Sequence, residues 1–189
     1  MYKTCLVWGI LALASPAWSQ GIDYDALFTD RADEVSVDDK GLHSLATAGD
    51  VTLYRAKEDG KWYNWGVDRS DQGSVGCAAK VITNLRAVAE ICTEIFPASQ
   101  IELVKDVDQK LMAFELANSY PPLSEDAQKR RIEEHAARGK DVFEQIVTDQ
   151  YGACPKRLET DVIRLARNTA VNLPDLLETP RFVVANPCF

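Results

Sequence analysis

The stretch from Ser74 to Pro97 constrains the fold most, because apolar residues recur there at a spacing of three and four positions. This spacing lines one side of a helix of about five turns. Ser74 offers an N-cap oxygen, which explains where the helix begins. Pro97 has no N–H to continue the helical hydrogen bonds, which explains where it ends. The pattern predicts a long amphipathic helix. Its apolar positions are Ala78, Val81, Ile82, Leu85, Val88, Ala89, Cys92, Ile95 and Phe96.

The same stretch contains two cysteines, Cys77 and Cys92. In one continuous helix the rise between them is roughly 22 Å, whereas a disulfide needs Cα atoms within about 7 Å. Each of them is therefore expected to pair with Cys154 or Cys188 instead. If residues 76–82 were extended and the helix began later, a bridge between Cys77 and Cys92 would become possible.

Residues 1–19 have the features of a secretory signal peptide: Lys3 near the start, an apolar run over residues 6–14, and a small-x-small triplet that ends at Ser19. We predict cleavage before Gln20 and a periplasmic or secreted location. The apolar run is shorter than the ~20 residues of a membrane helix, and we expect no membrane span elsewhere. The absence of an Asn-x-Ser/Thr acceptor after the signal peptide favours a bacterial periplasm.

Composition limits the partners and indicates the redox compartment. The chain has 21 Lys and Arg against 29 Asp and Glu, for a net charge of −8, and removal of Lys3 with the signal peptide makes it −9. An acidic surface repels nucleic acid and anionic lipid, so neither is an expected partner. Four of the five cysteines remain after processing, and an even number in an oxidising compartment favours two disulfides. We predict one stapled domain over residues 20–189.

Residues 51–56 and 62–67 are strand-like runs joined through an Asp-Gly turn, which is a strong hairpin signal. Counting outward from the turn places Tyr54 opposite Trp65 and puts Tyr63 on the same face. An isolated hairpin is marginally stable in water, so this aromatic face is expected to lie on the helical core or on a partner. Packing against the core is the more ordinary of the two interpretations.

The hairpin also carries the candidate binding residues. Tyrosine and tryptophan dominate recognition surfaces because they combine apolar area with a polar tip. The candidates are Trp62, Tyr63, Trp65 and Tyr54. Trp62 is on the opposite face of the predicted hairpin and is the better surface candidate, so Trp62→Ala is expected to leave folding nearly intact and to impair binding.

The remaining patterns are mostly helical. Residues 36–48 are predicted as a short helix that carries His43, and longer amphipathic helices are predicted over residues 99–120, 124–151 and 155–169. The predicted fold class is mainly α: a disulfide-stapled bundle of about four long helices with one small antiparallel β-hairpin at about 51–67.

Catalytic and metal-binding patterns are weak in this sequence. The two histidines are His43 and His135, and Asp39, four residues before His43, would supply at most half a metal site. Packing roles are the ordinary interpretation for both. The sequence lacks a haem-attachment motif, a CxxC pair, a phosphate-binding glycine loop and a GxSxG elbow. We therefore expect no catalytic residue, no metal and no cofactor, although an enzyme is not excluded.

The leading hypothesis is an exported, non-catalytic protein of the cell envelope that binds another macromolecule, as an inhibitor, an immunity-type protein or an accessory protein. One alternative is a small-ligand or glycan-binding module that uses the aromatic hairpin. Another is an envelope hydrolase with carboxylate or His43 chemistry. A deep cleft that holds His43 or converging carboxylates would favour the hydrolase, and a flat, well-filled surface would favour the binding protein.

Overall fold

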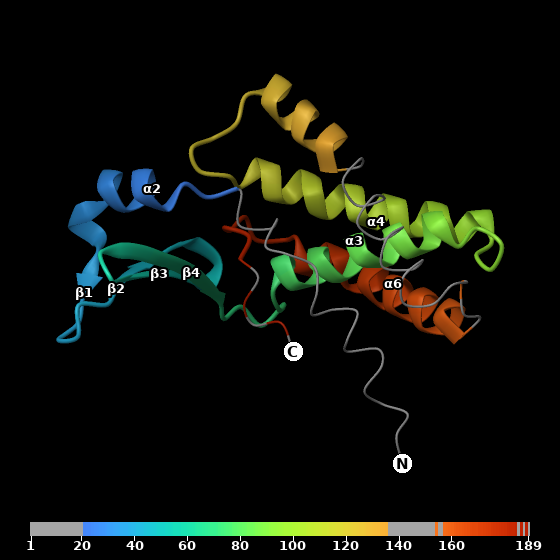
Figure 1. The fold of residues 1–189 in the computed structure, drawn as a ribbon, viewed down its shortest axis with the longest axis horizontal. Coiled ribbons are helices and arrows are strands. Elements are labelled where there is room, and N and C mark those ends of the chain that lie inside the picture. Colours follow the sequence, from blue (N-terminus) through green and yellow to red (C-terminus); the bar gives the residue numbers. More distant parts are fainter. Residues whose placement is uncertain (1–20, 136–153, 155–156, 185, 187, 189) are drawn as a thin grey trace, which may run out of the picture.

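The computed structural model describes residues 21–135, 154, 157–184, 186 and 188. The predicted signal peptide lies outside the described residues, as does the predicted third helix after residue 135. The described chain has a sheet covered by a short helix at one end and a group of longer helices at the other (Figure 1).

Three long helices form the helical part: α3 (Val75–Ile91), α4 (Ala98–Ala117) and α6 (Arg157–Leu176). They share one hydrophobic cluster, and a further helix over residues 125–135 lies beside α4 (Figure 1). The predicted start of α3 is confirmed, because the Ser74 side chain accepts a hydrogen bond from the N–H of Cys77. The helix ends at Ile91, before the predicted stop at Pro97.

Two disulfides fix α3 to distant parts of the chain. Cys77 pairs with Cys188, and Cys92 pairs with Cys154, across sequence separations of 111 and 62 residues. Cys77 lies in the first turn of α3 and Cys92 caps its end, so the prediction of one continuous helix that prevents their mutual bridge is confirmed. Both ends of α3 are therefore tethered.

The rest of the fold corrects the predicted bundle with one small hairpin. The hairpin is half of a four-stranded antiparallel sheet with strand order β1-β2-β3-β4. The strands are β1 (Ser36–Val37), β2 (His43–Ala46), β3 (Val51–Glu58) and β4 (Lys61–Asp68). The predicted fold class is therefore wrong, because the sheet is a substantial second part of the molecule.

The segment predicted as a helix over residues 36–48 forms the two extra strands. The carboxylate of Asp38 accepts hydrogen bonds from the N–H groups of Lys40 and Leu42, which builds a turn instead of a helix cap. Gly41 in this turn has a φ of 77°, which a helix does not allow. Leu45 then pairs opposite Leu53 of β3, where it gains a fully buried position that a short surface helix would not offer.

The β3–β4 hairpin has the predicted register. Tyr54 lies opposite Trp65, and Tyr63 lies opposite Ala56. Asp59 and Gly60 both have positive φ, of 48° and 80°, as the type I′ turn of a two-residue hairpin loop requires.

The helix α2 (Tyr24–Asp30) covers one face of the sheet (Figure 1). Its N-terminus is capped by the side chain of Asp23, which accepts from the N–H of Ala26. Leu27 and Phe28 are buried in a second hydrophobic cluster beneath this helix. The sheet and the C-terminal segment complete that cluster with Leu45, Val51, Leu53 and Val184.

A C-terminal strap, comprising residues 181–184 with 186 and 188, joins the two parts. Val183 belongs to the helical cluster, and Val184 belongs to the sheet cluster. The Arg181 guanidinium forms a fully buried ion pair with Asp68 at 3.0 Å, and the hydroxyl of Ser74 donates to the Val184 carbonyl at 2.7 Å. The strap therefore connects the end of β4 to the start of α3.

Within the described residues, none of the helices is both long and apolar enough to cross a membrane.

Candidate binding surface

Strand alternation gives the sheet two different faces. The inner face, against α2, carries the buried side chains of Leu45, Val51 and Leu53. The register places the opposite set of side chains on the other face, which we call the open face: Thr52, Tyr54 and Ala56 from β3, with Tyr63, Trp65 and Val67 from β4.

The open face is dominated by three aromatic rings. Tyr54 and Trp65 stack across the two strands, with ring centroids 5.5 Å apart and an interplanar angle of 15°. Tyr63 is 52% exposed and Trp65 is 37% exposed. The Tyr54 hydroxyl accepts a hydrogen bond from the Arg69 guanidinium at 3.2 Å, which adds a positive charge to the edge of the stack.

The expectation that this aromatic face packs on the core is wrong. Neither of the two hydrophobic clusters in the described part of the chain includes Tyr54, Tyr63 or Trp65. The physical reason is that β3 is apolar on both faces, and the addition of β2 supplies Leu45 to the face that carries Leu53. That face becomes the core face and leaves the aromatic rings exposed.

Trp62 lies on the inner face, near the hairpin turn and beyond the main contact with α2. The Arg55 guanidinium lies over the Trp62 indole at 4.5 Å from the ring centroid and also over the Phe28 ring of α2 at 4.6 Å. His43 meets the same indole edge-on at 5.2 Å. Trp62 is 36% exposed, and its contacts give it a packing role through cation–π interactions. The prediction that it also binds a partner is not tested by this arrangement.

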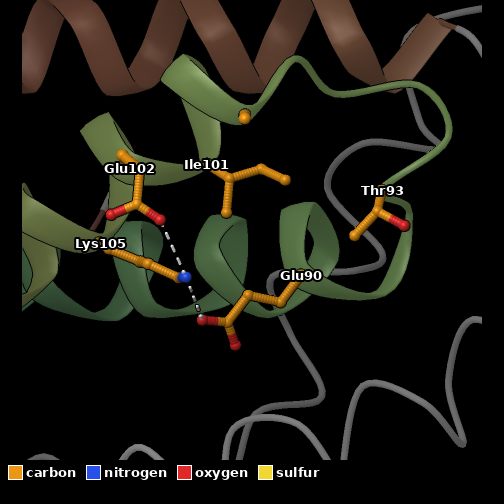
Figure 2. Close-up of a pocket in the computed structure, with 6 residues that line it drawn as sticks. Glu90, Thr93, Ile101, Glu102 and Lys105 are labelled. Carbon is orange, nitrogen blue, oxygen red and sulfur yellow. Dashed lines mark hydrogen bonds and ion pairs between the residues drawn. The ribbon is translucent and has the colours of Figure 1, made fainter.

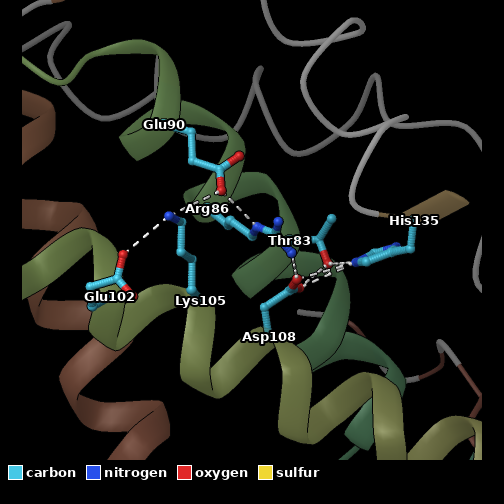
Figure 3. Close-up of polar contacts among 7 residues, drawn as sticks. All are labelled: Thr83, Arg86, Glu90, Glu102, Lys105, Asp108 and His135. Atoms are coloured by element: carbon cyan, nitrogen blue, oxygen red, sulfur yellow. Dashed lines mark hydrogen bonds and ion pairs between the residues drawn. The ribbon is translucent and has the colours of Figure 1, made fainter. Parts of the chain in front are cut away.

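A buried polar cluster lies between the helices and was not predicted from the sequence (Figure 3). Its centre is Asp108 of α4, which is 1% exposed. The Asp108 carboxylate accepts from the Thr83 hydroxyl at 2.6 Å and from the Arg86 guanidinium at 2.8 Å, both on α3. His135 approaches the same carboxylate with Nε2 at 3.3 Å. Asp108 therefore joins three helices.

The contacts of Asp108 keep it ionised. Burial raises its pKa, but the hydrogen bonds from His135, Thr83 and Arg86 outweigh that effect and hold the pKa below its usual value. The same contacts that lower the pKa of Asp108 make its carboxylate a poor general base for the Thr83 hydroxyl. The cluster has the geometry of a structural brace, and a charged residue on the apolar stripe of α4 is the sequence signal that could have revealed it.

A series of ion pairs extends from Asp108 toward the C-terminal end of α3 and the N-terminal end of α4. Arg86 also bonds Glu90 at 3.0 Å, and Lys105 lies 4.0 Å from Glu90 and 3.1 Å from Glu102. Glu90, Glu102 and Lys105 border a pocket of about 450 Å³ (Figure 2). The ammonium group of Lys105 bridges the two carboxylates, so these side chains form an ion-pair network.

The other predicted chemical residues are not brought together. His43 lies in β2 and Asp39 in the preceding turn, so the helix face that would have paired them does not exist. The group of possible metal ligands found among the described residues is Cys92, Glu94 and Cys154, and both of its sulfur atoms belong to one disulfide. This arrangement is not a metal site.

Glu115 of α4 is a second buried carboxyl group that sequence reasoning missed. It is 7% exposed, and its Oε2 atom has no hydrogen-bond partner. Burial raises the pKa of Glu115 to about 7, and the charge of Arg131 opposes that shift. It lies against Gly21, whose backbone is close enough that a Cβ there would be 3.6 Å from Glu115 Oε1.

Comparison with protein-family models, with curated proteins and with solved structures found no match for this chain.

Proposed function

We propose that this protein is a non-catalytic binding protein whose open face contacts another macromolecule. The observation that carries the proposal is the set of three partly exposed rings of Tyr54, Tyr63 and Trp65 on one sheet face. Large aromatic side chains in an ordered arrangement lose little conformational entropy on binding and contribute much of the energy of protein interfaces.

Two further features support a protein partner. Arg69 is held beside the rings by the Tyr54 hydroxyl, and arginine next to tyrosine and tryptophan is the composition that interface hot spots favour. The sheet is also rigidly mounted, because the buried Arg181–Asp68 pair and the disulfide at Cys188 fix the strap behind it. A preformed surface avoids part of the ordering cost of association.

The proposal includes export. Its supports are the signal-peptide pattern of residues 1–19 and the two disulfides, which persist in oxidising compartments. The partner would then be a component of the cell envelope or of the medium, met by an inhibitor, immunity-type or accessory protein.

A glycan is the second candidate, and one observation favours it. The Tyr54–Trp65 stack is nearly parallel, with an interplanar angle of 15°, and sugar rings also pack on ordered aromatic faces. Recognition of a glycan would use the same residues. Titration of the Trp62→Ala variant, in which Trp65 is the remaining tryptophan of the mature chain, with soluble envelope glycans distinguishes the two candidates through its intrinsic fluorescence.

The test compares two variants of the mature protein as bait. Trp65→Ala removes a ring from the open face, and Trp62→Ala removes the same side chain from the inner face of the same strand. An envelope extract of the source cell supplies partners, and each one recovered is purified and titrated against the wild type and both variants.

We expect Trp65→Ala to weaken binding by a factor of about 10 or more, which is typical of a central aromatic contact. In place of the impaired binding that the sequence alone led us to expect for Trp62→Ala, we expect this variant to retain most of its binding, because Trp62 packs on the inner face. Equal binding by the wild type and Trp65→Ala would refute the open face as the contact. Loss only in Trp62→Ala would move the contact to the inner face.

A further inference from the structure

The outer edge of β4 is the end of the sheet. In an antiparallel sheet, the N–H and C=O groups of one residue both point toward one neighbouring strand, and those of the next residue both point to the opposite side. The N–H of Arg69 donates to the Asp50 carbonyl at 3.0 Å, so the odd-numbered residues of β4 face β3. The even-numbered residues therefore face outward, and they are Trp62, Asn64, Gly66 and Asp68.

Only the last of these four has a backbone partner in the described part of the chain. The N–H of Asp68 donates to the Asn186 carbonyl of the strap at 2.9 Å, whereas the backbone groups of Trp62, Asn64 and Gly66 make no hydrogen bond there. Proteins usually protect such an edge with a short strand, proline or several charges. β4 is eight residues long, contains no proline and carries only Lys61 as a charged residue before Asp68.

We propose that a second copy of this chain pairs along this edge. β4 of one copy lies antiparallel to β4 of the other, about a two-fold axis at Tyr63, so that the two sheets become one. This dimer goes beyond the proposed binding function and does not depend on it.

The hydrogen-bond pattern and the strap together select this register. Outward-facing residues must meet outward-facing residues, so even-numbered positions pair with even-numbered positions. An axis at Asn64 would bring the second copy's turn to Asp68, where Asn186 of the strap already accepts the N–H. An axis at Tyr63 pairs Trp62 of each copy with Asn64 of the other, which are both exposed, and stops short of Gly66, which Val184 of the strap covers.

This register is also favourable for the side chains. It places the Tyr63 rings of the two copies next to each other on the open face, and Lys61 of each copy beside Trp65 of the other, in reach of a cation–π contact. The contacting strands carry few charges, so the net charge of −9 expected for the mature protein adds little repulsion at the contact itself. The dimer would join the two open faces into one continuous aromatic surface.

The first test is sedimentation velocity of the mature protein over roughly 1 to 100 µM, a range that detects modest association. Asn64→Pro removes an outward N–H that the sheet does not use, a position where an edge strand tolerates proline. The matched control is Val37→Pro on the other edge of the sheet. Its N–H also faces outward, because the adjacent Asp38 donates its N–H inward to the Leu42 carbonyl.

We expect a dimer for the wild type and for Val37→Pro, and at least a tenfold weaker association for Asn64→Pro with an unchanged far-ultraviolet circular dichroism spectrum. A wild type that stays monomeric throughout the range overturns the proposal and leaves the edge to a strand of a different protein. Dimers in both proline variants overturn it as well.

If Asn64→Pro does not fold, a cysteine scan decides the question. Facing Cβ atoms of a directly opposed antiparallel pair are about 4.5 to 5.5 Å apart, close to disulfide geometry. We expect Tyr63→Cys to form a covalent dimer faster than Val37→Cys, its exposed control, on a non-reducing gel. Equal rates for the two variants overturn the proposed axis.

Discussion

Glu115 should make the stability of the fold depend on pH around neutrality. The carboxyl group is buried, its Oε2 atom has no hydrogen-bond partner, and burial raises its pKa from 4.5 to about 7. In the unfolded chain the group regains its ordinary pKa. Between these two values the folded state therefore binds more protons than the unfolded state, and folding becomes less favourable as the pH rises.

The size of the effect follows from the two pKa values. The stabilising contribution is fully present below pH 4.5 and is lost as the pH rises through about 7. One pKa unit corresponds to about 1.4 kcal/mol, so the total change in the free energy of unfolding is about 3 kcal/mol. Asp108 acts in the opposite direction at lower pH, because its pKa is lowered and its contribution is lost only on acidification.

The assay is urea unfolding of the disulfide-intact protein at steps from about pH 5 to pH 9, followed by circular dichroism. Glu115→Gln keeps the shape and cannot ionise. We expect the unfolding free energy of the wild type to fall relative to Glu115→Gln by most of that 3 kcal/mol over this range. Glu102→Gln is the control on the same helix, since the Glu102 side chain is 72% exposed. Parallel pH curves for the wild type and Glu115→Gln would refute the reasoning.

Three other substitutions test the supports of the fold. Asp108→Asn removes the more deeply buried of the two carboxylates that Arg86 bonds, and we expect it to lower the unfolding free energy in urea by about 3 kcal/mol. An unchanged midpoint would contradict the brace. Cys154→Ser should lower the unfolding free energy by about 2 to 5 kcal/mol and leave Cys92 as a buried free thiol, which a thiol reagent labels once urea unfolds the chain. Gly66→Ala would place its Cβ 2.3 Å from Val184 Cγ1, so we expect a melting temperature lowered by several degrees, equivalent to about 1 to 3 kcal/mol.

Local patterns predicted the parts of the fold that depend on local geometry. The period of the apolar residues and the Ser74 cap predicted α3, and the rise of that helix excluded a bridge between Cys77 and Cys92. The Asp-Gly turn predicted the register of β3 with β4. In each case the deciding interaction lies within a few residues or within one element.

Tertiary pairing decided what the sequence could not show. Residues 36–48 have a plausible helical pattern, but pairing with the open edge of β3 gives Leu45 a buried position. Helix propensity is a weak preference, and the burial of Leu45 outweighs it. The aromatic residues of the candidate surface were identified correctly as one face. Which face of the hairpin packs against the core depends on β2 and α2, and the alternation of residues within the hairpin does not reveal it. Asp108 was missed because its partners come from two other helices.

Because the strap is at the C-terminal end of the described chain, the sheet is synthesised before the segment that completes it. Arg181 follows its partner Asp68 by 113 residues, so the sheet leaves the ribosome long before that segment. During that interval Asp68 keeps an unpaired charge, and the surface of Leu53 and Gly66 that Val184 later covers stays exposed. The edge of β4 is then longer than in the finished fold. A nascent chain is most vulnerable to premature strand pairing in this interval, and a chaperone that covers β4 would protect it.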